Sequence, residues 1–265
     1  MTTLNRLSVL AAGLALGLAA PVVKADPIVQ SLHPTNLSAA TFNSDFQPIS
    51  GSPAQMSPVQ FQGSAASGVM ESQVFQGTGA EQGLYAYAYQ IAVNSNGLTS
   101  TGDPAHIDSA SFHFNATPVG TDLTGSGTNS LSYVVTDGQL GGLTLPTQTG
   151  PGGAFQVPTE LSWQAQANSG VLRAQFENAA TGAPTLTAGS NSATFVVIST
   201  QPPTQQFVNL QSADPQTNLP SVYAPTPGTI QVIPIPEPTT ILAWAGMAGA
   251  VALVRRVRKH RAVMA

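Results

Sequence analysis

A hydrophobic alternation with a period of two residues runs through residues 69–200. From Leu84 to Val93, every second side chain is a tyrosine, isoleucine or valine, and the residues between them are mostly alanine. Successive side chains of a strand point to opposite faces, so this run reads as a strand with one large apolar face. Shorter runs of the same kind lie at residues 111–114, 130–135, 161–166, 172–177 and 194–198, with glycine-rich turns between them. The pattern predicts an all-β fold, namely an antiparallel β-sandwich of jelly-roll or immunoglobulin-like type.

The charge distribution excludes nucleic acid as an expected partner. Between Asp26 and Pro236 the chain has eleven acidic residues and one basic residue, Arg173, which gives a net charge of −10 (1 − 11). Nucleic-acid binding depends on lysine and arginine side chains that neutralise phosphates. The chain also has no cysteine, which excludes disulfides, thiolate catalysis and zinc–thiolate sites.

Residues 1–25 have the composition of a secretory signal peptide. Arg6 supplies the positive start, residues 7–20 form an apolar run, and Pro21 follows that run. The triplet Val23-Lys24-Ala25 places small or modest side chains where a signal peptidase reads them. We therefore expect cleavage between Ala25 and Asp26, with signal peptidase and the general secretion machinery as partners.

The mature chain is expected to have three parts. Residues 26–200 form the β-sandwich body, and their first part, residues 26–68, is a proline-containing irregular lead-in with one or two short edge strands and no helix. Residues 201–235 contain seven prolines and are predicted to be a semi-rigid linker, within which residues 206–211 can still add an edge strand.

The third part, residues 236–261, combines three features in a fixed order. Pro236-Glu237-Pro238 is followed by two threonines and then by an apolar run at residues 241–254, which predicts a single transmembrane helix. Basic residues next to such a span hold that end in the cytoplasm. The basic anchor consists of Arg255, Arg256, Arg258, Lys259 and Arg261.

Residues 236–261 resemble the PEP-CTERM sorting domain in the tripeptide, the apolar span and the basic end. The resemblance implies an exported bacterial protein that is held transiently in the inner membrane. It further implies an exosortase as processing enzyme and partner, with cleavage at or near Pro236-Glu237-Pro238, and delivery to the cell surface or extracellular matrix. Exopolysaccharide is the matrix partner that this setting suggests. Residues 72–79 and 83–91 of the body also resemble uncharacterised exosortase substrates, which implies no biochemical activity.

One cluster in the body has residue types suited to chemistry. Asp103, His106, Asp108 and His113 lie within eleven residues of one another, and such groups can ligate a metal or share protons. On a strand, however, His106 and Asp108 share a face while His113 points the other way. Surface or half-buried polar residues are therefore the favoured interpretation. We expect no catalytic, cofactor-binding or metal-binding residues, no cofactor, and a protein that is not an enzyme.

The tyrosine face of residues 84–93 has two interpretations. It can be a sugar-stacking platform, but its continuation into Ile91 and Val93 favours sandwich core. The body's lone cation, Arg173, must find its partners on neighbouring strands. The expected role is structural or adhesive. The alternative is an exported carbohydrate-binding module or glycan-active enzyme, because the two carboxylates of a glycosidase are brought together by the fold and not by sequence spacing.

Overall fold

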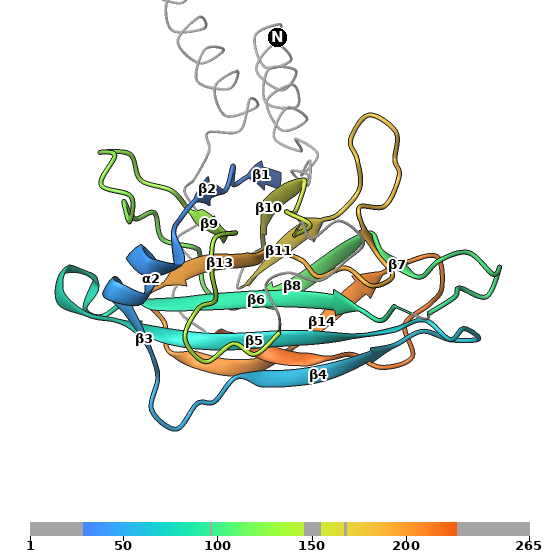
Figure 1. Ribbon diagram of the computed structural model, residues 1–265. Coiled ribbons are helices and arrows are strands. Elements are labelled where there is room, and N and C mark those ends of the chain that lie inside the picture. Colours follow the sequence, from blue (N-terminus) through green and yellow to red (C-terminus); the bar gives the residue numbers. More distant parts are fainter. Residues whose placement is uncertain (1–28, 96, 146–154, 167–168, 227–265) are drawn as a thin grey trace, which may run out of the picture. The chain divides into compact units, whose positions relative to one another are not determined.

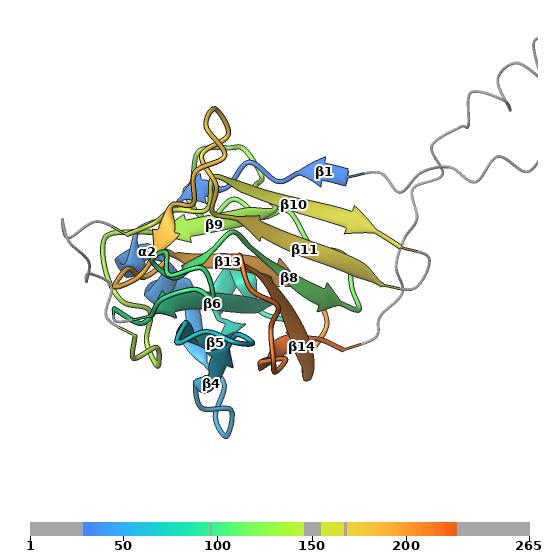
Figure 2. The same ribbon diagram turned by 90° about the vertical axis from the view of Figure 1, so that its right-hand side faces the viewer.

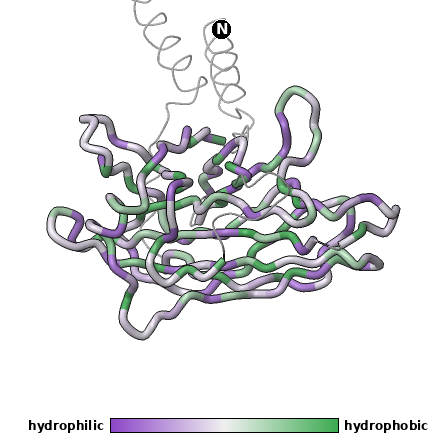
Figure 3. The backbone as a smooth tube through the Cα atoms, viewed as in Figure 1, coloured by the Kyte–Doolittle hydropathy of each residue, from purple (hydrophilic) through white to green (hydrophobic). Residues whose placement is uncertain are grey.

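The alternating residues form antiparallel strands in the computed structural model (Figure 1), which describes residues 29–226 except 96, 146–154 and 167–168. All of these residues belong to one compact unit. The prediction is confirmed at the coarser level, because the described residues form a mostly β structure with antiparallel sheets. Among the paired strands that the structure describes, the only parallel pair joins Thr35–Asn36 to Ser132–Val135. Figure 3 traces the alternation of hydrophilic and hydrophobic residues along the strands.

The larger sheet is built around the strand predicted from the tyrosine alternation. Its order is β2-β9-β13-β6-β5-β3, with β4 also paired to β5. Strands β5 and β6 form a long antiparallel hairpin, in which Val74 lies opposite Tyr87. The strands are β2 (Thr35–Asn36), β3 (Phe46–Pro48), β4 (Gln55–Gln60), β5 (Ser67–Gly77), β6 (Tyr85–Val93), β9 (Ser132–Val135) and β13 (Thr194–Ser199).

The second sheet has six strands in the order β1-β10-β11-β8-β14-β15. They are β1 (Val29–Ser31), β8 (Ser109–Phe114), β10 (Glu160–Ala165), β11 (Gly170–Gln175), β14 (Pro203–Gln211) and β15 (Ser221–Pro225). A two-stranded ladder pairs β7 (His106–Ile107) with β12 (Leu186–Thr187). A short 3-10 turn, η1 (Gly79–Glu81), joins β5 to β6.

The main core lies between the two sheets. Its centre is the ring of Tyr89 on β6, whose centroid is 4.4 Å from that of Phe112 on β8 and 5.6 Å from that of Phe195 on β13. Trp163 on β10 extends the same core and lies 6.0 Å from Phe114. Large aromatic side chains bury the most apolar surface per residue, and here they join both sheets through one contact network.

The six-stranded sheet curls so that its last strand closes on the larger sheet, which gives a half-barrel. Figure 2 shows the sheet curving from β10 through β11 and β8 to β14. At the closed side, the Ser57 hydroxyl donates to the carbonyl of Ser221 at 2.8 Å. The backbone N–H of Tyr223 donates to the Ser72 hydroxyl at 3.1 Å. These bonds tie β15 to β4 and β5 without a continuous ladder.

A second apolar cluster covers the other face of the larger sheet and contains α2 (Ala39–Asp45). This helix corrects the prediction that residues 26–68 contain none. The Ser38 hydroxyl caps the helix by accepting from the N–H of Thr41 at 3.0 Å. Phe42 packs edge-on against Phe75 of β5, with ring centroids 4.9 Å apart. The helix is too short for a three-turn periodicity, and it is held by its cap and by one buried ring.

A buried carboxylate fastens the loop at residues 140–145 onto the same face. Glu71 on β5 is fully buried. Its two oxygens accept from the N–H and hydroxyl of Thr144 at 2.8 and 2.7 Å and from the N–H of Leu145 at 2.8 Å. Hydrogen bonds of this kind offset the cost of taking a carboxylate out of water.

The predicted linker at residues 201–235 is corrected over its first two thirds, because β14 and β15 lie there. Val208 and Leu210 of β14 alternate into the main core and are buried. The prolines do not block the ladder, since Pro203 and Pro225 pair with each other at the ends of their strands. Proline is tolerated at such end positions because its missing N–H is not needed there.

Both predicted targeting segments, residues 1–25 and 236–261, lie outside the described residues. The same holds for the predicted transmembrane helix at 241–254. Within the described part of the chain, no helix is long and apolar enough to cross a bilayer.

Candidate functional site

The outward face of the six-stranded sheet carries polar side chains because its strands alternate strictly. On β10 and β11, Leu161 and Leu172 point into the core and are fully buried. Their neighbours Ser162 and Arg173 lie directly opposite each other on the other face. Arg173 is also in register with Ser111 of β8. A serine therefore flanks the arginine on each side, across three adjacent strands.

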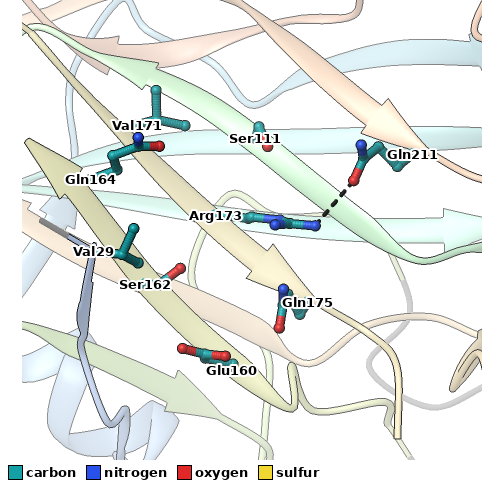
Figure 4. Close-up of a pocket in the computed structure, with 9 residues that line it drawn as sticks. All are labelled: Val29, Ser111, Glu160, Ser162, Gln164, Val171, Arg173, Gln175 and Gln211. Carbon is teal, nitrogen blue, oxygen red and sulfur yellow. Dashed lines mark hydrogen bonds between the residues drawn. The ribbon is translucent and has the colours of Figure 1, made fainter. Parts of the chain in front are cut away.

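These outward residues line a groove of about 290 Å³ (Figure 4). The lining draws on five strands of the one sheet, β1, β8, β10, β11 and β14. It consists of Val29, Ser111, Glu160, Ser162, Gln164, Val171, Arg173, Gln175 and Gln211. We call this set the Arg173 groove. Hydroxyl and carboxamide groups dominate it, so the groove offers hydrogen-bond donors and acceptors together.

The guanidinium of Arg173 is held by side chains of the adjacent strand β8 and of β14, the strand beyond it. Its Nη2 donates to Gln211 Oε1 at 3.1 Å and to Ser109 Oγ at 3.4 Å. The Ser109 hydroxyl donates in turn to the same Gln211 oxygen at 2.7 Å. The expectation that Arg173 finds partners on neighbouring strands is thus confirmed. These partners are neutral, and they fix the guanidinium without cancelling its charge.

The Arg173 groove has one carboxylate among its lining residues, that of Glu160. Over the described residues, the single ion pair joins His106 to Asp108, so neither Arg173 nor Glu160 is in one. A glycosidase needs two carboxyl groups on opposite sides of the scissile bond. The described lining of the groove supplies one such group.

Of the candidate cluster Asp103, His106, Asp108 and His113, only His106 and Asp108 form an ion pair. His106 Nε2 lies 3.5 Å from Asp108 Oδ1, both side chains being partly buried. The pKa of Asp108 is raised above its ordinary value. Burial is the main cause, the neighbouring His106 opposes it, and the nearby Glu177 adds to it. His113 is exposed on β8, and Asp103 accepts from the Thr101 hydroxyl at 2.8 Å within its own turn. Among the described residues there is no group of three or more histidine and carboxylate side chains placed to hold a metal.

The tyrosine face is core, as predicted. Tyr87 and Tyr89 are completely buried, which removes them as a stacking platform. Their hydroxyls donate to the carbonyls of Gln201 at 2.7 Å and Tyr223 at 2.6 Å. Burial, and then the neighbouring tyrosine, raises the pKa of each phenol well above its ordinary value. Both phenols stay neutral and act as fixed donors.

The residues predicted to direct sorting lie outside the described part of the chain. They are the motif Pro236, Glu237 and Pro238, the cleavage pair Ala25 and Asp26, and the basic anchor Arg255, Arg256, Arg258, Lys259 and Arg261.

Sequence reasoning did not identify the Arg173 groove. The alternation of residues 161–166 and 172–177 does reveal which of their side chains face outward. It does not reveal that β8, which is distant in sequence, pairs with β11 and supplies Ser111, or that β14 pairs with β8 and supplies Gln211. No family model, curated protein or solved structure matches this chain.

Proposed function

We propose that this chain is an exported bacterial protein of the cell surface or extracellular matrix, sorted and cleaved by an exosortase at Pro236-Glu237-Pro238. The observation that carries the proposal is the order of features at residues 236–261, where tripeptide, apolar span and basic anchor follow one another. The apolar run at 241–254 anchors the protein transiently in the inner membrane, and the basic residues after it keep the C-terminal end of the chain in the cytoplasm. The prolines keep the motif extended and readable by the enzyme.

We also propose that the body is a β-sandwich of jelly-roll or immunoglobulin-like type. The aromatic core shared by the two sheets supports this assignment. Since β15 ends at Pro225, the proposed stalk is limited to residues 226–235, which lead to the sorting signal.

Intact-mass analysis of protein recovered from the surface of the producing bacterium tests the sorting proposal. The recovered protein should begin at Asp26 and end at or near the residues 236–238, because both targeting segments are removed during export. Surface material that still begins at Met1, or that retains residues 241–265, would contradict the proposal.

A second candidate function is carbohydrate binding by the body, and the Arg173 groove is the observation that favours it. Its serine and glutamine side chains match the donors and acceptors of sugar hydroxyls. Incubation with the producer's own polysaccharide separates the alternatives. A binding module retains the protein on the polymer without releasing reducing ends, whereas a glycan-active enzyme releases them.

A further inference from the structure

The body's only arginine or lysine lies in the groove. Between Lys24 and Arg255 the sequence has no other Lys or Arg than Arg173, against eleven acidic residues from Asp26 to Asp214. None of the carboxylates that the structure describes forms an ion pair with it. A lone cation in an acidic protein would ordinarily be drawn to one of these carboxylates. Here it is held by neutral groups, so its charge remains available to a ligand.

The guanidinium is also oriented. Only Nη2 takes part in the bonds to Gln211 and Ser109, at 3.1 and 3.4 Å. Figure 4 shows the Arg173 side chain reaching across the sheet toward Gln211, with Ser162, Gln175 and Glu160 around its strand. A planar guanidinium fixed by one nitrogen presents its other donors in a defined direction. Arginine is the side chain best suited to bidentate recognition of a carboxylate.

We propose that the Arg173 groove binds a saccharide unit that carries a carboxylate group. This inference rests on the second proposed function, carbohydrate binding by the body. The carboxylate takes the donors of Arg173 that its bonds to Gln211 and Ser109 leave unused. The hydroxyls of the sugar ring bond to the side chains of Ser162, Gln164 and Gln175. The cavity of about 290 Å³ is at the small end of ligand pockets and suits a short stretch of such a chain.

The charge pattern limits the ligand further. Binding of a nucleic acid or another dense polyphosphate requires many cations, and this groove has one. Glu160 in the same groove repels a second negative charge nearby. The groove is therefore suited to one carboxylate per bound segment, with neutral hydroxyl-rich units on either side.

Binding of two matched probes to the full chain in detergent tests the proposal. The probes are a galactose tetramer in which one unit is replaced by galacturonic acid, and the all-galactose tetramer. Their binding is measured by calorimetry at low salt. We expect the acidic probe to bind at least ten-fold more tightly than the neutral one, and added salt to reduce the difference. Arg173→Gln should weaken the acidic probe about ten-fold and leave the neutral probe nearly unchanged.

Two further variants test whether charge in the groove controls the affinity for the acidic probe. Glu160→Gln should strengthen binding of the acidic probe a few-fold, because it removes a like charge from the groove. Gln205→Ala is the matched control, since Gln205 is an exposed residue of β14 outside the groove lining. Arg173 and Glu160 both lie on the outward face of the six-stranded sheet, away from the core. Circular dichroism should therefore show an unchanged fold in both variants.

The outcomes separate the two inferences. Equal binding of both probes, or an Arg173→Gln variant that keeps the preference for the acidic probe, overturns the carboxylate assignment and leaves carbohydrate binding standing. Binding of neither probe, and of no polysaccharide from the producer, overturns carbohydrate binding itself.

Discussion

At the scale of single residues, the polar groups of this protein connect segments that are far apart in the sequence. Asp214 is an example, because it follows β14 and accepts from the N–H of Ser100 at 2.9 Å and from the Ser100 hydroxyl. Hydrogen bonds from Ser100 hold the pKa of Asp214 below its ordinary value of 3.8. A carboxylate with a depressed pKa stabilises the fold while it is ionised.

This pKa shift predicts an acid-dependent contribution to stability. The contribution of Asp214 is fully present above the ordinary pKa of 3.8 and is lost as the pH falls through the lower, folded-state pKa. Asp214→Asn should therefore be less stable than the wild type near neutral pH and should lose less stability on acidification. Urea unfolding between about pH 6 and about pH 3 measures both slopes. Ser100→Ala should shift the profile in the same direction. Parallel profiles for all three proteins would contradict the prediction.

The sequence predicted the core role of Tyr87 and Tyr89 because their alternation with alanine reveals the buried face. Their hydrogen-bond acceptors, the carbonyls of Gln201 and Tyr223, were not predictable. Those carbonyls lie more than a hundred residues away and reach the tyrosines only after the sheets have closed. Gln211 was not predictable as a partner of Arg173 either, because the two side chains meet only once β14 has paired with β8.

At the scale of elements, strands with strong alternation were predictable and short, locally capped elements were not. The helix α2 spans seven residues, which is too few for a periodic signal. Its sequence does contain a local signal, with Ser38 as N-cap between Leu37 and Phe42, two apolar residues of the second cluster. That arrangement has the spacing of a hydrophobic staple. Proline content hid β15, and it limited the prediction for β14 to a possible edge strand at residues 206–211, whereas β14 spans Pro203–Gln211 and lies between β8 and β15. The prolines stand at strand ends, where they do not interrupt the ladder.

The structural role of β14 predicts opposite outcomes for two neighbouring substitutions. Val208 is fully buried, while Asn209 next to it is exposed. Val208→Asp places an unpaired carboxylate in the core and should cost on the order of 3 kcal/mol or more of unfolding free energy. Asn209→Asp adds the same charge at the surface and should cost within about 0.5 kcal/mol. Urea unfolding followed by circular dichroism measures both, and equal tolerance of the two changes would show that this segment is a linker.

At the scale of the whole molecule, the fold class followed from period-two patterns, but the order of the strands did not. The hairpin of β10 and β11 is local, whereas β11 also pairs with β8, some sixty residues earlier in the chain (170 − 109 = 61). Such pairings are decided by which apolar faces can share one core, and this depends on all strands together. The groove depends on the same pairings, so it could not be read from the sequence. The proposed sorting signal, in contrast, was found from the order of residues 236–261 alone.

Replacement of Pro236-Glu237-Pro238 by three alanines in the producing bacterium tests the sorting of this protein. Export should continue, because the predicted signal peptide at residues 1–25 is unchanged. The span at residues 241–254 should still stop transfer, since five basic side chains follow it and moving each through hydrocarbon costs several kcal/mol. Replacement of residues 230–232 by alanines serves as the control and should leave processing unchanged. Fractionation and immunoblotting should find the full-length motif variant in the inner membrane and both the wild type and the control at the surface or in the medium. A motif variant that is cleaved and released like the wild type would show that residues 236–261 are a membrane anchor without a sorting function.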